Sequence, residues 1–447
     1  MNGGPVARVR AHLDSAAGKA FITLADQGVV SATNFLTAVL VGRFAGTEEL
    51  GLYYLGFQGI LIFAQNTQMS LVSAAYIVYG PRLSGEDFRQ YTGSTLLHYA
   101  ALAVIAALGL LVAGLGLRAT GVPQDMAGLD KVLLVMAGAV IFFLLREYAR
   151  QVCFARLNAH AALVLDGFVL VAQVCGLMAL GGLGVLTADR AYMVVGLACG
   201  AGGLTWLAAR RQIFSPHMGR AWPDFRKNWR YSRWVFAMNL AFLGSMQIYP
   251  WLLVSFHGKE ANGILGACAT VIFLSNPFII GMSNFLGPKC VHALTERGAP
   301  GLQQVVRTAT AFFAVTMGGF CVIMLAGGGV ALHLLFGDAE LAAYGHVVSI
   351  WAVGQLAWAL RAPAEYGLNA IERPDVGFKA LLLMLLITVT AGVWLTWRYQ
   401  AAGVAVGIAA GQTAACVYSR TVFARQVGGL LRRGHNTERD TTRGENR

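Results

Sequence analysis

Long runs of apolar residues, separated by short polar segments, make up most of this chain. The run at 93–117 exceeds the ~20 apolar residues that a helix needs to cross a bilayer. The runs lack the alternation of a barrel strand, so they predict helices. We expect twelve membrane spans, at 20–42, 53–79, 93–117, 130–146, 161–183, 190–209, 234–256, 263–286, 306–327, 341–361, 377–397 and 401–421.

The composition agrees with a membrane protein. Of 447 residues, 56% are hydrophobic and 13% are charged, whereas a soluble domain carries roughly 25% charged residues. The mean hydropathy is +0.58. The net charge of +12 is spread over the segments between the spans, so we expect no nucleic-acid partner. The chain is predicted to be an all-α integral membrane protein.

The basic residues fall mainly on one side of the predicted membrane. Of the 34 Lys and Arg residues, 28 lie in segments on the side of the two termini. The remaining six are Arg43, Arg118, Lys131, Arg190, Lys259 and Arg398. Because cytoplasmic segments carry the excess of basic residues, both termini are predicted to be cytoplasmic.

A short pattern occurs once in each half of the chain. Gly46, Glu48 and Gly51 recur 212 positions later as Gly258, Glu260 and Gly263. A second set recurs after 211 positions: Arg150, Leu157, Asn158 and Ala159 become Arg361, Leu368, Asn369 and Ala370. Six spans separate the copies, so both halves enter the membrane in the same direction. We therefore expect two six-helix bundles related by a parallel pseudo-two-fold repeat, an arrangement typical of transporters.

The repeat divides the chain into four parts. We expect an N-terminal bundle at 1–209, a basic linker at 210–233, a C-terminal bundle at 234–421 and a disordered cytoplasmic tail at 422–447. The linker alternates arginines with aromatic residues, so it either lies on the anionic cytoplasmic leaflet or is a plain positive-inside connection.

Several kinds of chemistry have no motif in this sequence. The seven cysteines show no CxxC spacing, and we expect no disulfide and no metal site. There is no phosphate-binding GxxxxGK[ST], no HExxH and no GxSxG, and the predicted external loops are short. We therefore expect a protein that is not an enzyme, and no cofactor.

Polar residues inside the spans are the candidate site, because they are costly in hydrocarbon unless they serve a function. They concentrate in the first two spans of each half. As substrate-cavity residues we select Asp26, Gln27, Asn34, Gln65, Asn66, Gln68, Asn239, Gln247, Asn276 and Asn284. The polar block Gln65–Gln68 and its counterpart around Asn276 are expected to face each other across a water-filled space. The alternative is that these amides only bind neighbouring helices together.

Three charged residues have more specific candidate roles. Asp26 is the candidate site for a coupling ion, H⁺ or Na⁺, or else an acid paired with a nearby base. Arg150 and Arg361 are candidates to bind a diphosphate at the cytoplasmic gate. They are otherwise interfacial anchors paired with Glu147 and Glu365 one helical turn away.

The first span and the turn after it resemble a known family. They read LADQGVVSATNF from Leu24 to Phe35 and RFAGTEELGLY from Arg43 to Tyr53. This is similar to the opening of polysaccharide flippases of the multidrug/oligosaccharidyl-lipid/polysaccharide exporter superfamily. The resemblance extends to length, span number and six-plus-six symmetry.

The resemblance implies alternating-access transport of a polyprenyl-diphosphate-linked oligosaccharide across the bacterial cytoplasmic (inner) membrane. The expected partners are that substrate, anionic membrane lipids and a polysaccharide polymerase, with the chain itself a monomer. The rivals are a cation-coupled multidrug exporter of the same fold, a multi-span glycosyltransferase or polymerase, and a membrane scaffold.

The charge distribution gives a direct test of topology. Reporter fusions at residues 125 and 220 should report opposite sides of the membrane, with residue 220 in the cytoplasm. A periplasm-active enzyme and a cytoplasm-only fluorescent protein, fused in turn at both positions, measure this. The same side for both positions would overturn the predicted topology.

Overall fold

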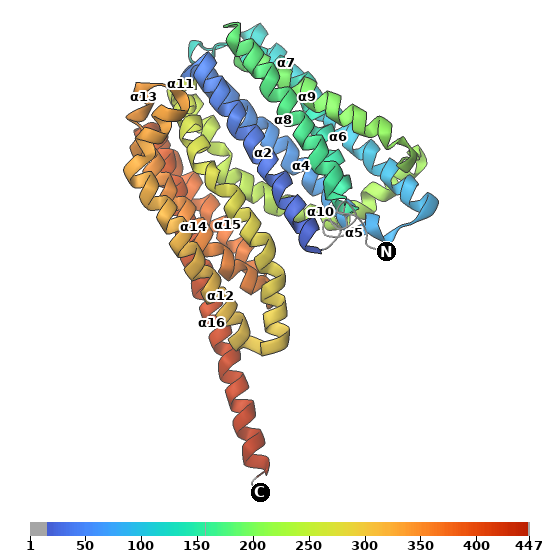
Figure 1. Cartoon of the computed structure of the whole chain (residues 1–447), viewed down its shortest axis with the longest axis vertical. Helices are drawn as coiled ribbons and strands as arrows, with labels where there is room; N and C mark the ends of the chain where they lie inside the picture. The colour runs from blue at the N-terminus through green and yellow to red at the C-terminus, as the bar shows by residue number, and fades with distance from the viewer. Residues whose placement is uncertain (1–15, 157, 446–447) are drawn as a thin grey trace, which may run out of the picture. The chain divides into compact units, whose positions relative to one another are not determined.

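The computed structural model describes residues 16–156 and 158–445. Some side chains fall outside this description, at residues 16–21, 23, 24, 234, 284, 285 and 433–445. The described chain is built of helices joined by short turns (Figure 1). It is an all-α integral membrane protein, as the sequence predicts.

The first part of the chain contains six helical passages. The first is α2 (Ala16–Ala45), and the second is a continuous run of short segments from α3 (Thr47–Tyr54) through α4 (Ile62–Gln68) to α5 (Ala74–Tyr79). The others are α6 (Gly85–Thr120), α7 (Leu129–Ala155), α8 (Ala159–Gly182) and α9 (Ala188–Ala209). Helix α7 packs against α6 and α9, and α2 packs against α8.

The rest of the chain supplies six more passages. Its helices are α10 (Met218–Met246), α11 (Ile248–Ile272), α12 (Asn276–Phe336), the short α13 (Ala339–Ala342), α14 (Gly345–Ala370), α15 (Asp375–Ile387) and α16 (Val393–Glu445). Non-helical backbone interrupts α11 at Gly258, α12 at Gly298 and α16 at Tyr399 and Gln400. The end of α10 and the start of α11 form one passage, and each interruption separates two others, so the described residues form twelve helical passages. They overlap the twelve predicted spans, and several extend well beyond them: α10 begins at Met218, where the span was expected from 234.

Length and apolar composition alone identify seven membrane-crossing helices in the described chain. Two of these, Val235–Phe336 and Asp375–Arg432, run across the interruptions and so contain several passages each. The second passage is absent from the seven, because departures from α-helical geometry cut it into short segments.

Those departures surround the polar block of the second passage. The π-helical segments Leu55–Leu61 and Met69–Ser73 lie on either side of α4, which holds Gln65–Gln68. At the corresponding place in the repeat, the 3₁₀ segment Phe273–Ser275 precedes Asn276. π-Bulges and 3₁₀ segments inside helices often occur at functional sites. These irregular segments therefore mark the surroundings of Gln65–Gln68 and of Asn276 as candidate sites.

The repeated glycine motif forms a reciprocal contact. A Cβ on Gly51 would lie 1.8 Å from the carbonyl oxygen of Lys259, and one on Gly263 would lie 1.9 Å from that of Thr47. The two contacts are related by the shift of 212 that relates the sequence motifs. Asn262 adds a hydrogen bond from Nδ2 to the Gly51 carbonyl, at 2.8 Å. The two copies of the motif therefore pack backbone to backbone.

Both copies of the motif also begin with the same backbone conformation. Gly46 has φ 87° and ψ 176°, and Gly258 has φ 80° and ψ −179°. Positive φ at these angles is accessible to glycine and strained for other residues. The turn therefore requires the first glycine, and the helix crossing requires the last.

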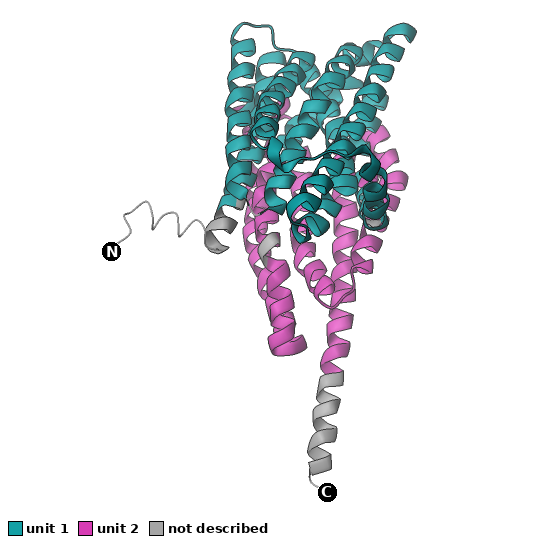
Figure 2. Ribbon diagram, turned by 90° about the vertical axis from the view of Figure 1, so that its right-hand side faces the viewer, with its two compact units in different colours: residues 1–243, 247–270, 335–338 teal, residues 244–246, 271–334, 339–447 magenta. Residues whose placement is uncertain are grey.

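The contacts divide the chain into two units, coloured separately in Figure 2. Unit 1 comprises 1–243, 247–270 and 335–338, and unit 2 comprises 244–246, 271–334 and 339–447. Residues 247–270 thus pack with the first unit although they belong to the second sequence repeat. The relation of the repeat halves by a two-fold axis stays a prediction.

Two segments differ from the sequence expectation. Residues 422–432 were expected in a disordered tail, but they belong to α16, where Phe423 and Val427 are buried in the core of unit 2. Helix α16 continues to Glu445, with the side chains beyond Arg432 outside the description. In the predicted linker, α10 begins at Met218, and Asn228 is buried where it accepts a hydrogen bond from Tyr91.

The glycine crossing predicts that Gly→Ala substitutions at the crossing lower stability, whereas one elsewhere in a helix does not. Gly28→Ala should be neutral or slightly stabilising, because Gly28 is helical with nothing within 4 Å of a Cβ, and alanine favours a helix by about 1 kcal/mol. Gly51→Ala or Gly263→Ala should destabilise the fold by about 1–3 kcal/mol, because backbone must move. Thermal unfolding in detergent measures both. Equal midpoints for all three variants would contradict the close crossing.

Candidate functional site

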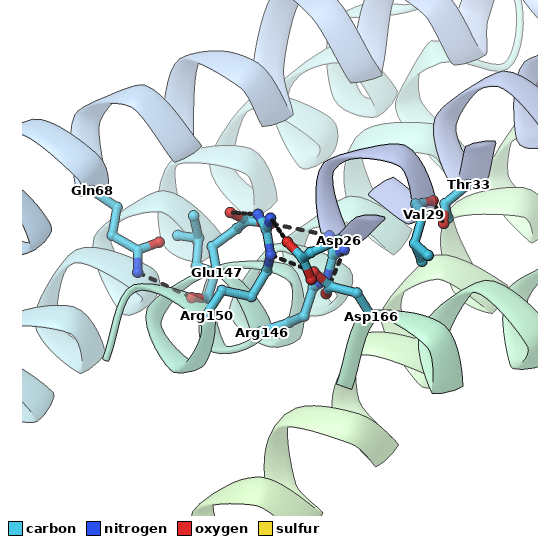
Figure 3. Close-up of polar contacts among 9 residues, drawn as sticks. Asp26, Val29, Thr33, Gln68, Arg146, Glu147, Arg150 and Asp166 are labelled. Atoms are coloured by element: carbon cyan, nitrogen blue, oxygen red, sulfur yellow. Dashed lines mark hydrogen bonds and ion pairs between the residues drawn. The ribbon is translucent and has the colours of Figure 1, made fainter. Parts of the chain in front are cut away.

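Five charged side chains meet inside unit 1, where membrane helices leave little water. They are Asp26 on α2, Arg146, Glu147 and Arg150 on α7, and Asp166 on α8 (Figure 3). Each of the five residues is less than 7% exposed. We refer to these five residues as the charged cluster. It joins three helices through side chains alone.

The two arginines of the cluster are each shared between carboxylates. Arg150 lies 2.9 Å from Asp26 Oδ2, 3.1 Å from Glu147 Oε2 and 2.5 Å from Asp166 Oδ2. Arg146 lies 2.7 Å from Asp166 Oδ1 and 3.0 Å from Glu147 Oε1. Because a buried charge is costly without a partner, this sharing is what allows the cluster to exist in a membrane.

The cluster carries one more acid than base. Three carboxylates face two guanidinium groups, so full ionisation leaves one negative charge. Asp26 Oδ1 is buried without a hydrogen-bond donor among the described residues. Both aspartates contact the same guanidinium group, that of Arg150. Uptake of one proton would leave the cluster neutral.

The side chains of the block Gln65–Gln68 contact different neighbours. Gln68 is buried and donates from Nε2 to the Leu144 carbonyl of α7, at 3.1 Å. Asn66 and Thr67 bond carbonyls of their own helix. Gln65 forms a hydrogen bond with Glu147 and so extends the charged cluster. Gln68 thus serves contact between helices, whereas Gln65 belongs to the candidate site.

Two further amides of the predicted cavity set contact the second passage. Asn239 Nδ2 donates to Ser70 Oγ at 2.5 Å, and Gln247 Nε2 donates to Gln58 Oε1 at 3.2 Å. Both pairs lie within unit 1. The sequence analysis missed Gln58 and Ser70, although each is a polar residue inside an apolar run.

The counterpart in unit 2 is organised around Asn276. Gln355 on α14 donates from Nε2 to Asn276 Oδ1 at 2.5 Å and to Ser275 Oγ at 3.1 Å. Gln355 was also missed, although its place in the middle of a span marked it. Gln27 and Asn34 are half-buried on α2, and the side chain of Asn284 lies outside the description. An arrangement of Gln65–Gln68 opposite Asn276 stays a prediction.

Arg150 and Arg361 form the ion pairs expected from their spacing. Arg361 Nε lies 3.4 Å from Glu365 Oε1, and Arg361 Nη1 donates to Met384 Sδ at 3.0 Å. Both arginines are more than 90% buried. Arg150 is saturated by carboxylates, which argues against its role as a diphosphate ligand. Arg361 has one carboxylate neighbour and is less fully engaged.

The charged cluster was only partly foreseen. Asp26, Arg150 and Glu147 were selected from the sequence, but Arg146 and Asp166 were not. A single aspartate in the middle of the span 161–183 was the available signal, because an ionisable group there needs a partner. Within the described residues no group of three or more His, Cys, Asp or Glu side chains could hold a metal ion.

The charge count predicts that two substitutions in the cluster differ greatly in their effect on stability. Arg150→Met leaves three carboxylates against one guanidinium and should destabilise the protein by about 3–5 kcal/mol. Asp26→Asn keeps the shape and makes the cluster neutral, so its unfolding midpoint should stay close to that of the wild type. Thermal unfolding of both variants in detergent measures this. A larger loss for Asp26→Asn than for Arg150→Met would refute the excess-acid description.

Comparisons with known proteins identify the fold. No family model matches the chain, and no curated protein matches it in sequence. It is similar in structure to an inward-facing multidrug resistance MATE family transporter of the MOP superfamily, with TM-score 0.72 and 14% identity over 92% of this chain and 99% of that one.

Two other solved structures share the fold. The lipid II flippase MurJ in an inward closed conformation has TM-score 0.71 and 14% identity, over 89% of this chain and 86% of that one. A MOP superfamily transporter from Pyrococcus furiosus has TM-score 0.63 and 14% identity, over 92% and 95%. The chain is a multi-pass membrane protein with the fold of MOP superfamily transporters.

Proposed function

We propose that the protein is a membrane transporter that flips a polyprenyl-diphosphate-linked oligosaccharide from the cytoplasmic to the outer leaflet by alternating access. The fold supports a transporter, since proteins of this fold include multidrug transporters and a lipid II flippase. The opening motif from Leu24 to Tyr53 supports the polysaccharide branch.

The observation that carries the substrate class is the set of neutral amide contacts inside the spans. Gln58 with Gln247, and Ser70 with Asn239, pair uncharged groups in unit 1. Gln355 and Asn276 do the same in unit 2. Each of these groups can give up its present hydrogen-bond partner and bind a sugar hydroxyl in its place. No buried charge is left unpaired by this exchange. A glycan headgroup needs many neutral donors and acceptors, which these residues supply.

The charged cluster is the candidate coupling site of this transporter. Its excess carboxylate can take up a proton or Na⁺ from one side and release it to the other, with Asp26 as the residue that gains the ion. A change in the charge of the cluster would alter the packing of α2, α7 and α8, because these side chains form ion pairs between the three helices. That is how ion binding could favour one conformation over the other.

The same cluster favours a second candidate, a cation-coupled multidrug exporter. An ion site with excess negative charge would serve either cargo, and a multidrug transporter shares the fold. The two candidates differ in the cavity, because a cationic drug needs acidic or aromatic groups where a glycan needs amides. The amide pairs therefore favour the flippase.

The proposal extends to location and partners. The protein is placed in the bacterial cytoplasmic membrane with both termini in the cytoplasm, as a monomer. A polysaccharide polymerase that consumes the flipped repeat unit is the expected partner in the membrane.

Reconstitution in liposomes tests the function with matched variants. The wild type should expose a lipid-linked oligosaccharide to an external lectin, faster under a pH or Na⁺ gradient. Asn239→Leu and Gln247→Leu should lower the initial rate about tenfold, because each lost hydrogen bond to the substrate costs roughly 1–1.5 kcal/mol. Thr316→Val is the control, because Thr316 Oγ1 donates to the Phe312 carbonyl of its own helix and lies outside the predicted cavity set.

Thermal unfolding of the same variants separates substrate binding from helix contact. Amides that only join helices contribute ~0.6 kcal/mol each on average, so their loss would lower the midpoint and leave flipping intact. Export of a cationic dye without lectin exposure of the oligosaccharide would reject the flippase in favour of the multidrug exporter.

A further inference from the structure

Unit 2 contains a groove of about 880 Å³ along residues 420–428 of α16. It is separate from the amide contacts of the candidate site. One wall is α12 after its interruption at Gly298, and the other is α16, with Ala364 of α14 between them. Every lining residue belongs to unit 2, so this unit forms the groove alone.

Three arginines line this groove, and no acidic residue does. They are Arg307 on α12 and Arg420 and Arg425 on α16, and all three are exposed. None of them takes part in an ion pair with another described residue. Arg420 donates only to uncharged groups, the Thr310 hydroxyl at 3.5 Å and the Leu360 carbonyl at 3.3 Å. The groove thus concentrates about three uncompensated positive charges.

Several arginines elsewhere in the described chain do have a carboxylate partner. Arg89 pairs with Glu86, Arg220 with Asp87, and Arg373 with Asp375. Glu365, near Arg420 on α14, is engaged by Arg361 and by the Ser419 hydroxyl. The arginines of the groove are therefore available to an anion that is not part of the described chain.

The groove crosses the level where lipid headgroups lie. Arg420 is about 28 Å along α16 from Ala401, at roughly 1.5 Å per residue, and the hydrocarbon core is ~30 Å thick. Arg425 lies about one and a half turns further towards the side that the basic residues mark as cytoplasmic. Arg420 is therefore at the edge of the hydrocarbon, and Arg425 is among the headgroups.

The lining also changes from polar to apolar towards the membrane interior. Along α12, Gln303 and Arg307 come first, then Thr310, and then the small residues Ala311 and Ala314. Beyond them the same helix exposes Val315, Val322 and Ile323. This order matches an amphiphile with its charged group at the cytoplasmic end and its chains along the helix. A small free anion would not contact the apolar part of the groove.

We propose that this arginine groove binds an anionic phospholipid of the cytoplasmic leaflet through its phosphate groups, with the acyl chains along Ala311 and Ala314. Guanidinium groups bind phosphate oxygens in pairs, and three of them suit a headgroup with two phosphodiesters, such as cardiolipin. Basic pockets between transmembrane helices on the cytoplasmic side bind such headgroups in general. This site is separate from the proposed function and does not depend on it.

Native mass spectrometry of the full-length protein tests the site by lipid titration. The wild type should bind cardiolipin more tightly than phosphatidylglycerol and far more tightly than phosphatidylethanolamine. Arg307→Gln/Arg425→Gln should weaken cardiolipin binding by about tenfold or more. The control Arg82→Gln/Arg89→Gln removes two basic residues elsewhere on the predicted cytoplasmic side and should change it less than about twofold. Equal loss in both double variants would overturn the site.

Two further measurements keep the test independent of folding and of the ligand's source. A photoreactive cardiolipin on the wild type should label peptides within 303–314 or 420–428, and labelling only elsewhere would overturn the proposal. Inorganic phosphate should not compete at millimolar concentration. Competition by it, or displacement of cardiolipin from the groove by a polyprenyl diphosphate at lower concentration, would reject a phospholipid as the occupant.

Discussion

Charge satisfaction inside hydrocarbon is the constraint on which unit 1 depends. A membrane offers no water to a carboxylate or guanidinium group, so each must find its partner within the protein. Asp26, Arg146, Glu147, Arg150 and Asp166 meet this requirement together, because Arg150 alone contacts carboxylates on three helices. One shared network of ion pairs therefore joins α2, α7 and α8.

The cluster is unbalanced in charge. It places three acids against two bases, so its five charges cannot be paired one to one. An unbalanced cluster is less stable than a balanced one, and it can change its charge by taking up an ion. The environment of Arg361 differs, because there one arginine meets one glutamate.

The arginines of the chain fall into different environments, which give them different roles. Arg150 is buried and saturated by carboxylates, so its role is to hold the cluster together. Arg361 is buried beside a single carboxylate and a methionine sulfur. Arg307, Arg420 and Arg425 are exposed without carboxylates, so they remain available to an external anion. Residue type alone does not distinguish these cases, because two of the carboxylates around Arg150, those of Asp26 and Asp166, lie on other helices.

The sequence by itself determined the fold class, the twelve spans and the internal repeat. The length of an apolar run indicates whether a helix lies in water or in a membrane. The repeated glycines indicate a turn that only glycine adopts without strain. What the glycines do in space was not visible: Gly51 and Gly263 approach each other's helix backbone, a contact across 212 residues. The sequence also marked Gln68 as a cavity residue, whereas the tertiary structure turns it towards α7. Which polar groups share a site depends on helix rotation and neighbours, and these are set by packing between segments far apart in the chain. Only the tertiary structure could bring Asp166 and Arg146 to Asp26, or place Arg307 beside Arg420 in one groove.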